Sequence, residues 1–207
     1  GEKHKLIEMV SKNADDALQL FIDKSKKDIS KTVGAAKDLA EYLHIDKTLG
    51  RIEAYDISNI KGVDSVGSMI VFTTGKPNNK DYRRFKIKTV NGPNDYESMR
   101  EIIERRIVHG LKEIEVNKET GKAAEDGKFS KFPDLIMIDG GLGHVNSVIP
   151  ILRSHHISIP VCGIVKDNKH RTRGLIYNGE EISIPITSNA FRLITAIQDE
   201  AHRFAIS

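Results

Sequence analysis

The sequence predicts an α/β domain built on a mixed sheet, in which an antiparallel three-strand meander is followed by parallel strands and flanked by helices. Two observations support this fold class. Three short segments with strand periodicity follow one another at residues 51–58, 66–76 and 81–90, with turn residues between them. Two continuous apolar runs, LIMI and IPVCGIV, then alternate with helical patterns, which is typical of parallel strands that are covered on both faces.

The amino-terminal segment has a different pattern. Apolar residues recur at helical spacing between residues 13 and 44, with charged residues between them. This periodicity predicts one or two amphipathic helices. We expect residues 1–48 to form an N-terminal helical appendage packed on the main domain, and residues 49–207 to form the main domain.

The segments after the meander complete the plan. A helix is expected to begin at Gly92 and Pro93. Residues 110–131 are charged and punctuated by glycine, so we expect an exposed, mobile excursion there. A glycine-containing hairpin over 174–184 and a helix over 188–206 finish the chain. This order, a meander and then strand, helix, strand and helix, is the ribonuclease H-like plan.

Composition narrows the functional classes. The chain has 207 residues, of which 39% are hydrophobic, enough for one good core. No apolar run approaches the roughly 18 residues of a membrane helix, and the amino terminus is charged, so we expect no membrane contact. The single cysteine, Cys162, excludes a disulfide framework and fits a reducing cytoplasm. Because the formal net charge is only +3, nucleic-acid contacts would have to come from a local basic patch.

Two aspartates stand where strands are expected to end. Asp56 lies late in the first strand, and Asp139 ends the buried run LIMI. If these strands are neighbours, the two carboxylates are close enough to repel each other, and a shared proton or a cation is needed between them. Oxygen ligands favour Mg²⁺ or Mn²⁺. Such a cation can polarise a phosphodiester and activate a water molecule.

Each candidate also has a purely structural explanation. A strand-end aspartate often caps a turn, and Asp95 in the first turn of a helix is explained by the helix dipole. His202 falls beside the apolar stripe of the last helix, where a packed histidine is a sufficient explanation, with Asp199 placed to orient it. The third strand places Tyr82, Arg84, Lys86 and Lys88 on one face. This face either follows a phosphate backbone or is simply solvated.

A dinucleotide-binding oxidoreductase is an alternative function. The run GLGHVN, residues 141–146, is close to a dinucleotide fingerprint, and Asp167 is placed like a ribose-binding acid. However, Asn146 stands where the fingerprint requires a small residue, and Asp139 would repel a pyrophosphate.

Four ordered motifs carry a more specific signal. They are RIEAYDISNIKG, DYRRFKIKTVNGPNDYESMREIIERR, PDLIMIDGGLGHVN and DEAHRFAI. Together they resemble the carboxy-terminal endonuclease region of the UvrC family, the incision subunit of bacterial nucleotide excision repair. The resemblance implies a ribonuclease H-like endonuclease that cuts DNA on the 5′ side of a lesion with a divalent metal, Mg²⁺ or Mn²⁺. It also implies that Asp56, Asp139 and His202 are the catalytic, metal-binding set, with Asp95 as a further acidic position.

The resemblance also implies partners, and it has departures. The expected partners are damaged double-stranded DNA and, through the full-length protein, the UvrB–DNA complex. Leu142 and His144 stand where the family often has lysine and glutamine. The chain begins with Gly1 and stops before the usual tandem helix-hairpin-helix module, so we expect a monomeric piece of a longer protein with weak DNA affinity by itself. A non-catalytic nucleic-acid-binding module of the same fold is the main alternative.

Overall fold

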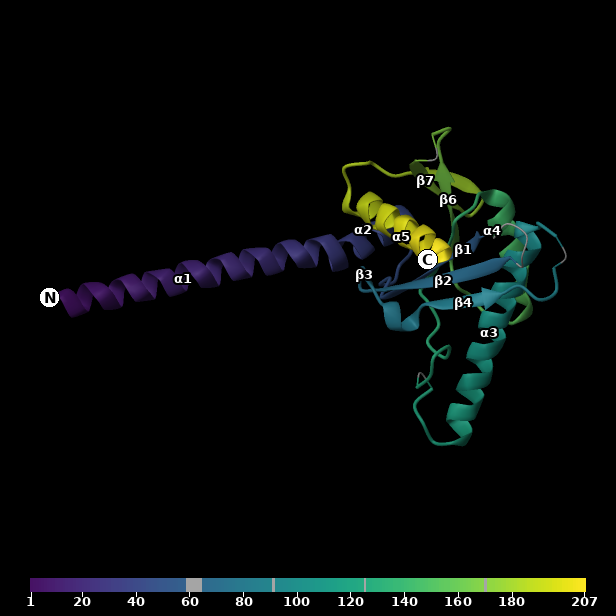
Figure 1. Ribbon diagram of the computed structural model, residues 1–207, viewed down its shortest axis with the longest axis horizontal. Coiled ribbons are helices and arrows are strands. Elements are labelled where there is room, and N and C mark those ends of the chain that lie inside the picture. The colour runs from purple at the N-terminus through teal and green to yellow at the C-terminus, as the bar shows by residue number, and fades with distance from the viewer. Residues whose placement is uncertain (59–64, 91, 125, 170) are drawn as a thin grey trace.

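The computed structural model describes residues 1–58, 65–90, 92–124, 126–169 and 171–207 (Figure 1). Its strands in chain order are β1 (Arg51–Ser58), β2 (Val66–Thr73), β3 (Lys76–Pro77), β4 (Arg83–Lys86), β5 (Leu135–Ile138), β6 (Val161–Lys166), β7 (Thr172–Tyr177) and β8 (Glu180–Ser183). Its helices are α1 (Glu2–Ile29), α2 (Ala35–Tyr42), α3 (Asp95–Glu119), α4 (Leu142–Ser154) and α5 (Asn189–Ile206).

The strands form one mixed sheet in the order β3-β2-β1-β5-β6-β7-β8, with β4 also paired to β2. Strands β1, β2 and β4 are the predicted antiparallel meander, and β1, β5 and β6 run parallel to one another. The β7–β8 hairpin turns at Asn178 and Gly179, both with positive φ (51° and 82°), as an Asn-Gly hairpin turn requires. The ribonuclease H-like fold class predicted from the sequence is therefore confirmed.

Helices cover both faces of this sheet. Helix α5 packs on β1 and β2, and α2 packs on α5. Helices α3 and α4 pack on each other, with α3 on β1 and α4 on β6. Because successive side chains of a strand point to opposite faces, Glu53 of β1 meets Arg106 of α3, whereas Ser58 reaches Ala205 of α5. Residues of β1 with even numbers, including Asp56, therefore belong to the α5 side.

The amino-terminal helices differ in how they contact the body. Helix α1 buries none of its residues and extends away from the body in Figure 1. A π-helical segment, Ser30–Gly34, joins it to α2, which buries Ala35, Ala36, Leu39 and Ala40. Asp38 of α2 also accepts a hydrogen bond from the backbone N–H of Ala190 (2.9 Å). None of the described helices combines the length and apolarity needed to cross a membrane.

The charged segment over 110–131 is more ordered than expected. Helix α3 begins at an N-cap, where Asn94 Oδ1 accepts from the Glu97 N–H (3.1 Å), and it continues to Glu119. The following residues fold back along it, because Glu113 accepts from the backbone N–H groups of Phe129 and Ser130. The segment expected to form an excursion is thus helical up to Glu119, and its Phe129 and Ser130 are bound to Glu113 of α3. Charge and glycine content alone did not show these anchors.

Candidate active site

The two strand-end aspartates are neighbours, as the sequence predicts. Strand β1 pairs with β5 in parallel, with Tyr55 opposite Ile138, so Asp56 and Asp139 are the next residues of adjacent strands. The backbone N–H of Asp139 donates to the carbonyl of Tyr55 (3.0 Å), which fixes the chain where it leaves β5. Parallel pairing thus brings together two carboxylates that are 83 residues apart, at one edge of the sheet.

All four predicted catalytic residues line one cavity of about 330 Å³. Asp56 comes from β1, Asp139 from the end of β5, Asp95 from the first turn of α3, and His202 from the exposed side of α5. His202 is therefore not the packed core-edge histidine of the structural explanation, because its side chain is exposed. Helices and strands from distant parts of the sequence thus contribute to a single polar pocket.

Electrostatics within the pocket is dominated by the two carboxylates. The pKa of Asp56 is raised to about 6, first by burial and then by the charge of Asp139, against opposing effects of His202 and Lys166. A carboxylate that is both desolvated and faced by a second carboxylate holds its proton more tightly than in water. A positive charge placed near the two carboxylates would therefore stabilise the pocket.

Lys166, which was not predicted from the sequence as a site residue, supplies one positive charge to this pocket. Lys166 ends β6, and its Nζ lies 2.8 Å from Oδ1 and 2.9 Å from Oδ2 of Asp139. Strand β6 is parallel to β5, so the carboxyl ends of both strands meet at the same edge of the sheet. The signal was present in the sequence, because the apolar run IPVCGIV ends directly at this lysine.

A divalent cation fits the donor chemistry of the pair, although not the arrangement of the side chains as they stand. Oδ1 of Asp139 is buried and has no hydrogen-bond partner among the described residues, since the contact with Lys166 Nζ lacks hydrogen-bond geometry. In the same described part of the chain, no group of three histidine, cysteine, aspartate or glutamate side chains is already placed to hold a metal. A cation bound by Asp139 would therefore displace the ammonium of Lys166.

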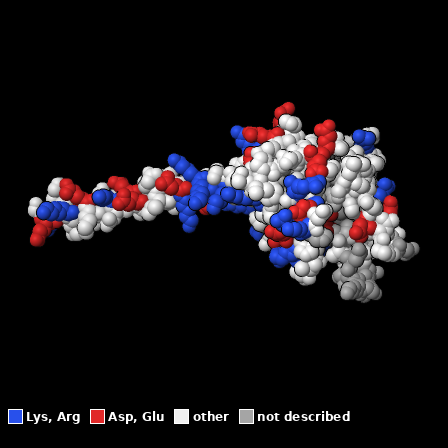
Figure 2. Space-filling view, turned by 90° about the horizontal axis from the view of Figure 1, so that it is seen from above, with Lys and Arg blue, Asp and Glu red and all other residues white. Residues whose placement is uncertain are grey.

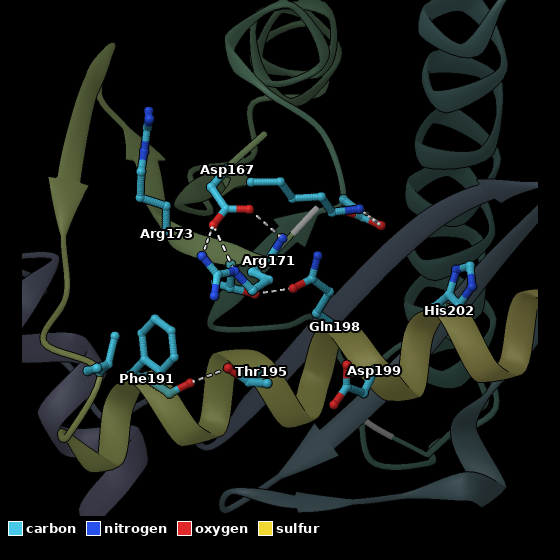
Figure 3. A pocket seen from close by; sticks show the side chains of 12 residues that line it. Asp167, Arg171, Arg173, Phe191, Thr195, Gln198, Asp199 and His202 are labelled. Atoms are coloured by element: carbon cyan, nitrogen blue, oxygen red, sulfur yellow. Dashed lines mark hydrogen bonds and ion pairs between the residues drawn. The ribbon is translucent and has the colours of Figure 1, made fainter. Parts of the chain in front are cut away.

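A larger cavity of about 810 Å³ continues from this pocket. The two cavities share Asp139, Lys166 and His202. In Figure 3, Phe191, Thr195, Gln198 and His202 follow one another along α5, facing the loop that carries Asp167 and Arg171. Both carboxylate oxygens of Asp167 are used, by the side chain of Arg171 and by two backbone N–H groups. The pocket thus opens into a longer groove.

The glycines after Asp139 permit close packing around a second histidine, His144. A Cβ on Gly140 would lie 2.5 Å from Nδ1 of His144, and a Cβ on Gly143 would lie 2.8 Å from the ring of Tyr96. The Tyr96 and His144 rings are themselves 4.5 Å apart. His144, one of the two departures from the usual family motif, therefore lines the pocket and packs on α3 through Tyr96.

The four predicted DNA-binding residues fall into two groups in the structure. Tyr82 is buried and packs edge-on against Phe204 (5.1 Å). Arg84 donates to the carbonyls of Phe204 and Ser207 (both 2.7 Å) at the end of α5. Lys86 and Lys88 are exposed. Two of the four side chains are thus engaged with α5, and two face solvent.

Replacing Asp56 with asparagine is expected to stabilise the fold. A raised carboxyl pKa means that the folded state binds the proton more tightly than the unfolded state, so the free energy of unfolding falls as pH rises from about 4 to about 6. Removing this charge should raise the free energy of unfolding at pH 7.5 by about 1–3 kcal/mol. Urea unfolding with EDTA from pH 4 to pH 8 measures this. An unchanged pH slope in the variant would contradict it.

Comparisons with known proteins identify the family of this chain. The family model described as the UvrC RNAse H endonuclease domain matches residues 40–206. UvrABC system protein C of Clostridium novyi and that of Alkaliphilus oremlandii are each 54% identical to this chain over 207 residues, covering 100% of the chain and 33% of each relative. The chain therefore spans about a third of the length of the curated relatives it matches.

Solved structures are more distant. A Ciona intestinalis endonuclease V in complex with DNA is 14% identical, with a TM-score of 0.35, covering 72% of this chain and 60% of that chain. The C-terminal lobe of a budding yeast Argonaute is 14% identical, with a TM-score of 0.33, covering 71% of this chain and 32% of that chain. Because the family match extends over most of the sequence, the chain belongs to the UvrC RNase H endonuclease domain family.

Proposed function

We propose that this domain cuts a DNA strand on the 5′ side of a lesion in nucleotide excision repair, using Mg²⁺ or Mn²⁺. The observation that carries the proposal is the convergence of Asp56, Asp95, Asp139 and His202 on one cavity in a member of the UvrC endonuclease family. The substrate is damaged double-stranded DNA, presented as a UvrB–DNA complex to the full-length protein. The names of the relatives support this assignment, since they are UvrABC system proteins.

The roles proposed for the side chains come from the family resemblance and are supported by the cavity that these side chains share. Asp56, Asp139 and His202 would hold the cation, which when bound polarises the scissile phosphate and lowers the pKa of a water molecule. Asp95 lines the same cavity, where it would orient that water or bind the cation through it. The repulsion between Asp56 and Asp139 would be compensated by the positive charge of such a cation.

Removal of the metal tests the proposal at its centre. With UvrA, UvrB and a lesion-containing duplex, the full-length protein should lose 5′ incision in EDTA and regain it when Mn²⁺ is added. For this 207-residue chain, Mn²⁺ should raise the melting temperature in a saturable manner. The non-catalytic binding module would be favoured if the chain bound DNA but neither bound Mn²⁺ nor supported incision.

Contacts with DNA outside the cavity would come from local basic patches. Figure 2 shows lysine and arginine side chains gathered where α1 meets the body, and α1 carries Lys26 and Lys27 in its last turn. The exposed Lys86 and Lys88 form a second basic position, on the meander. Patches of this kind bind phosphates without reading sequence.

Lys86 and Lys88 are expected to contact phosphate, and Arg84 is not. Replacing both lysines with methionine should weaken DNA binding and reduce the slope of log K against log salt by about 1 for each lysine that binds a phosphate. Arg84→Met should instead lower the melting temperature, because Arg84 binds the carbonyls at the end of α5. Fluorescence anisotropy across a salt series separates the two. A salt slope that is unchanged in the double lysine variant would leave these side chains as a solvated face.

A further inference from the structure

Lys166 occupies the junction of the two cavities. Its side chain lines both, and it is the residue whose ammonium lies 2.8 Å and 2.9 Å from the oxygens of Asp139. The two partners are unequally exposed, because 35% of the Lys166 side chain and only 7% of the Asp139 side chain is accessible. The carboxylate is therefore fixed in the pocket, while the lysine reaches it from the open groove.

The ion pair between Lys166 and Asp139 compensates the negative charge of the pocket only in part. One ammonium supplies a single positive charge to a site with two carboxylates, Asp56 and Asp139, so the mutual repulsion of these acids is only half compensated. A divalent cation compensates both charges and binds through the same oxygens. Lysine is a point charge on a flexible four-carbon stem, so it can leave without disturbing the strand that carries it.

The larger cavity adjoins the ion pair and would accept the displaced ammonium of Lys166. Arg171, another cation that lines the larger cavity, is held by Asp167 (2.8 Å), and Arg173 is held by Glu181 (2.7 Å). Lys166, once it is released from Asp139, would add a positive charge that these carboxylates do not already neutralise. It would lie next to the cation pocket, in the larger cavity that Phe191 of α5 also lines. A groove lined by both cations and an aromatic side chain is typical of one that holds a nucleic-acid strand.

We propose that Lys166 is an exchangeable counter-ion: it neutralises Asp139 in the metal-free protein, and it moves into the adjoining groove to bind a phosphate of the DNA strand when a divalent cation takes its place. The exchange couples metal binding to substrate binding, since each ligand favours the same position of the lysine. This inference rests on the proposed function, because it takes the cation and the DNA strand from it.

The first test is Mn²⁺ affinity without DNA, measured by calorimetry on the 207-residue chain. Lys166→Met removes the competitor and should bind Mn²⁺ about tenfold more tightly than the wild type, whereas Lys166→Arg should restore affinity close to the wild-type value. Lys169→Met is the matched control, because it removes the same charge from an exposed residue that lines neither cavity. Equal or weaker binding by Lys166→Met would overturn the proposal. If Lys166→Met does not melt cooperatively, Lys166→Gln replaces it, since its amide can still donate to Asp139.

The second test is the coupling itself. Affinity for a short fluorescein-labelled duplex is measured with and without Ca²⁺, which stands in for the cation. Ca²⁺ should tighten DNA binding by the wild type and by Lys169→Met by about tenfold, and this factor should fall by about threefold or more in Lys166→Met. An equal factor in all three proteins would overturn the exchange.

The two tests also distinguish failure of the inference from failure of the proposed function. If the wild type bound neither Mn²⁺ nor Ca²⁺, the metal-dependent function itself would fail, and the exchange would fail with it. If the wild type bound both the cation and DNA, and Lys166→Met behaved like Lys169→Met, only the exchange would be wrong.

Discussion

Replacing Asp139 with asparagine is expected to lower the rate of 5′ incision by the full-length protein by about a thousandfold or more, equivalent to about 4 kcal/mol of transition-state stabilisation. Only 7% of the Asp139 side chain is accessible, and its buried Oδ1 has no hydrogen bond among the described side chains. Asparagine keeps the shape but cannot supply a charged ligand. Incision on the 3′ side and folding should persist, because neither depends on this oxygen.

Asp134→Asn is the matched control for this prediction. Asp134 lies at the other end of the same strand, and its Oδ2 accepts from the backbone N–H of Arg51 (2.9 Å) outside both cavities. The same chemical change at this position should leave incision on both sides within about twofold and affect only stability. Gel analysis of a duplex labelled at each end measures both cuts. If the Asp139 variant still cut on both sides, the assignment of the pocket would be refuted.

The sequence predicted the pocket because its carboxylates obey simple rules. Asp56 and Asp139 follow strand patterns, and parallel pairing of those strands makes them adjacent. The end of the apolar run IPVCGIV places Lys166 at a strand end in the sequence, but its ion pair with Asp139 could not be predicted in the same way, because a lysine at a strand end usually faces solvent. Its role requires the pairing of β6 with β5, which is a property of the folded sheet.

Long-range contacts also explain the other differences. The meander predicted a basic face with Tyr82 and Arg84 in register, but the end of α5 lies on that part of the strand and takes both side chains. Helix α3 was expected to end near Gly110. In the structure, a Cβ at this position would lie 2.7 Å from the Phe129 carbonyl, so glycine there permits the returning chain to approach rather than ending the helix.

A buried charge network under α3 was also absent from the sequence-based picture. Glu53 is fully buried in the centre of β1, where alternation alone identified only a strand residue. Its Oε1 accepts from Arg51 Nη2 (3.0 Å) and Arg106 Nη2 (2.9 Å), and its Oε2 accepts from Tyr55 Oη (2.7 Å) and Arg106 Nε (3.1 Å). Burial alone would lower the pKa of Arg106, but the charge of Glu53 reverses this effect and raises it. The guanidinium of Arg106 therefore keeps its charge in the core.

Arg106 extends this network to the segment that returns from α3. Its Nη1 donates to the carbonyl of Phe129 (2.6 Å), and its Nη2 donates to the carbonyl of Lys131 (2.7 Å). One guanidinium thus joins β1, α3 and the chain that leads into β5, whose end carries Asp139. The network fixes the strand that carries Asp56 and the segment that precedes Asp139.

Glu53→Gln is accordingly expected to lower the free energy of unfolding by about 3–5 kcal/mol, because it leaves the buried guanidinium of Arg106 without its counter-charge and leaves Arg51 with Asp81 as its remaining carboxylate partner. Urea unfolding at neutral pH measures the loss. Glu181→Gln is the matched control, since Glu181 also pairs with an arginine, Arg173, but at 41% exposure for the glutamate side chain. That change should cost less than about 1 kcal/mol.

A double variant separates the cost of an unpaired charge from the value of the pair. Replacing Glu53 and Arg106 together with methionine removes both charges and should cost less than the sum of the two single replacements, since neither charge is then left unpaired by the loss of the other. Strictly additive losses would show that the two side chains contribute independently. In that case the carbonyls of Phe129 and Lys131, rather than Glu53, would account for the burial of Arg106.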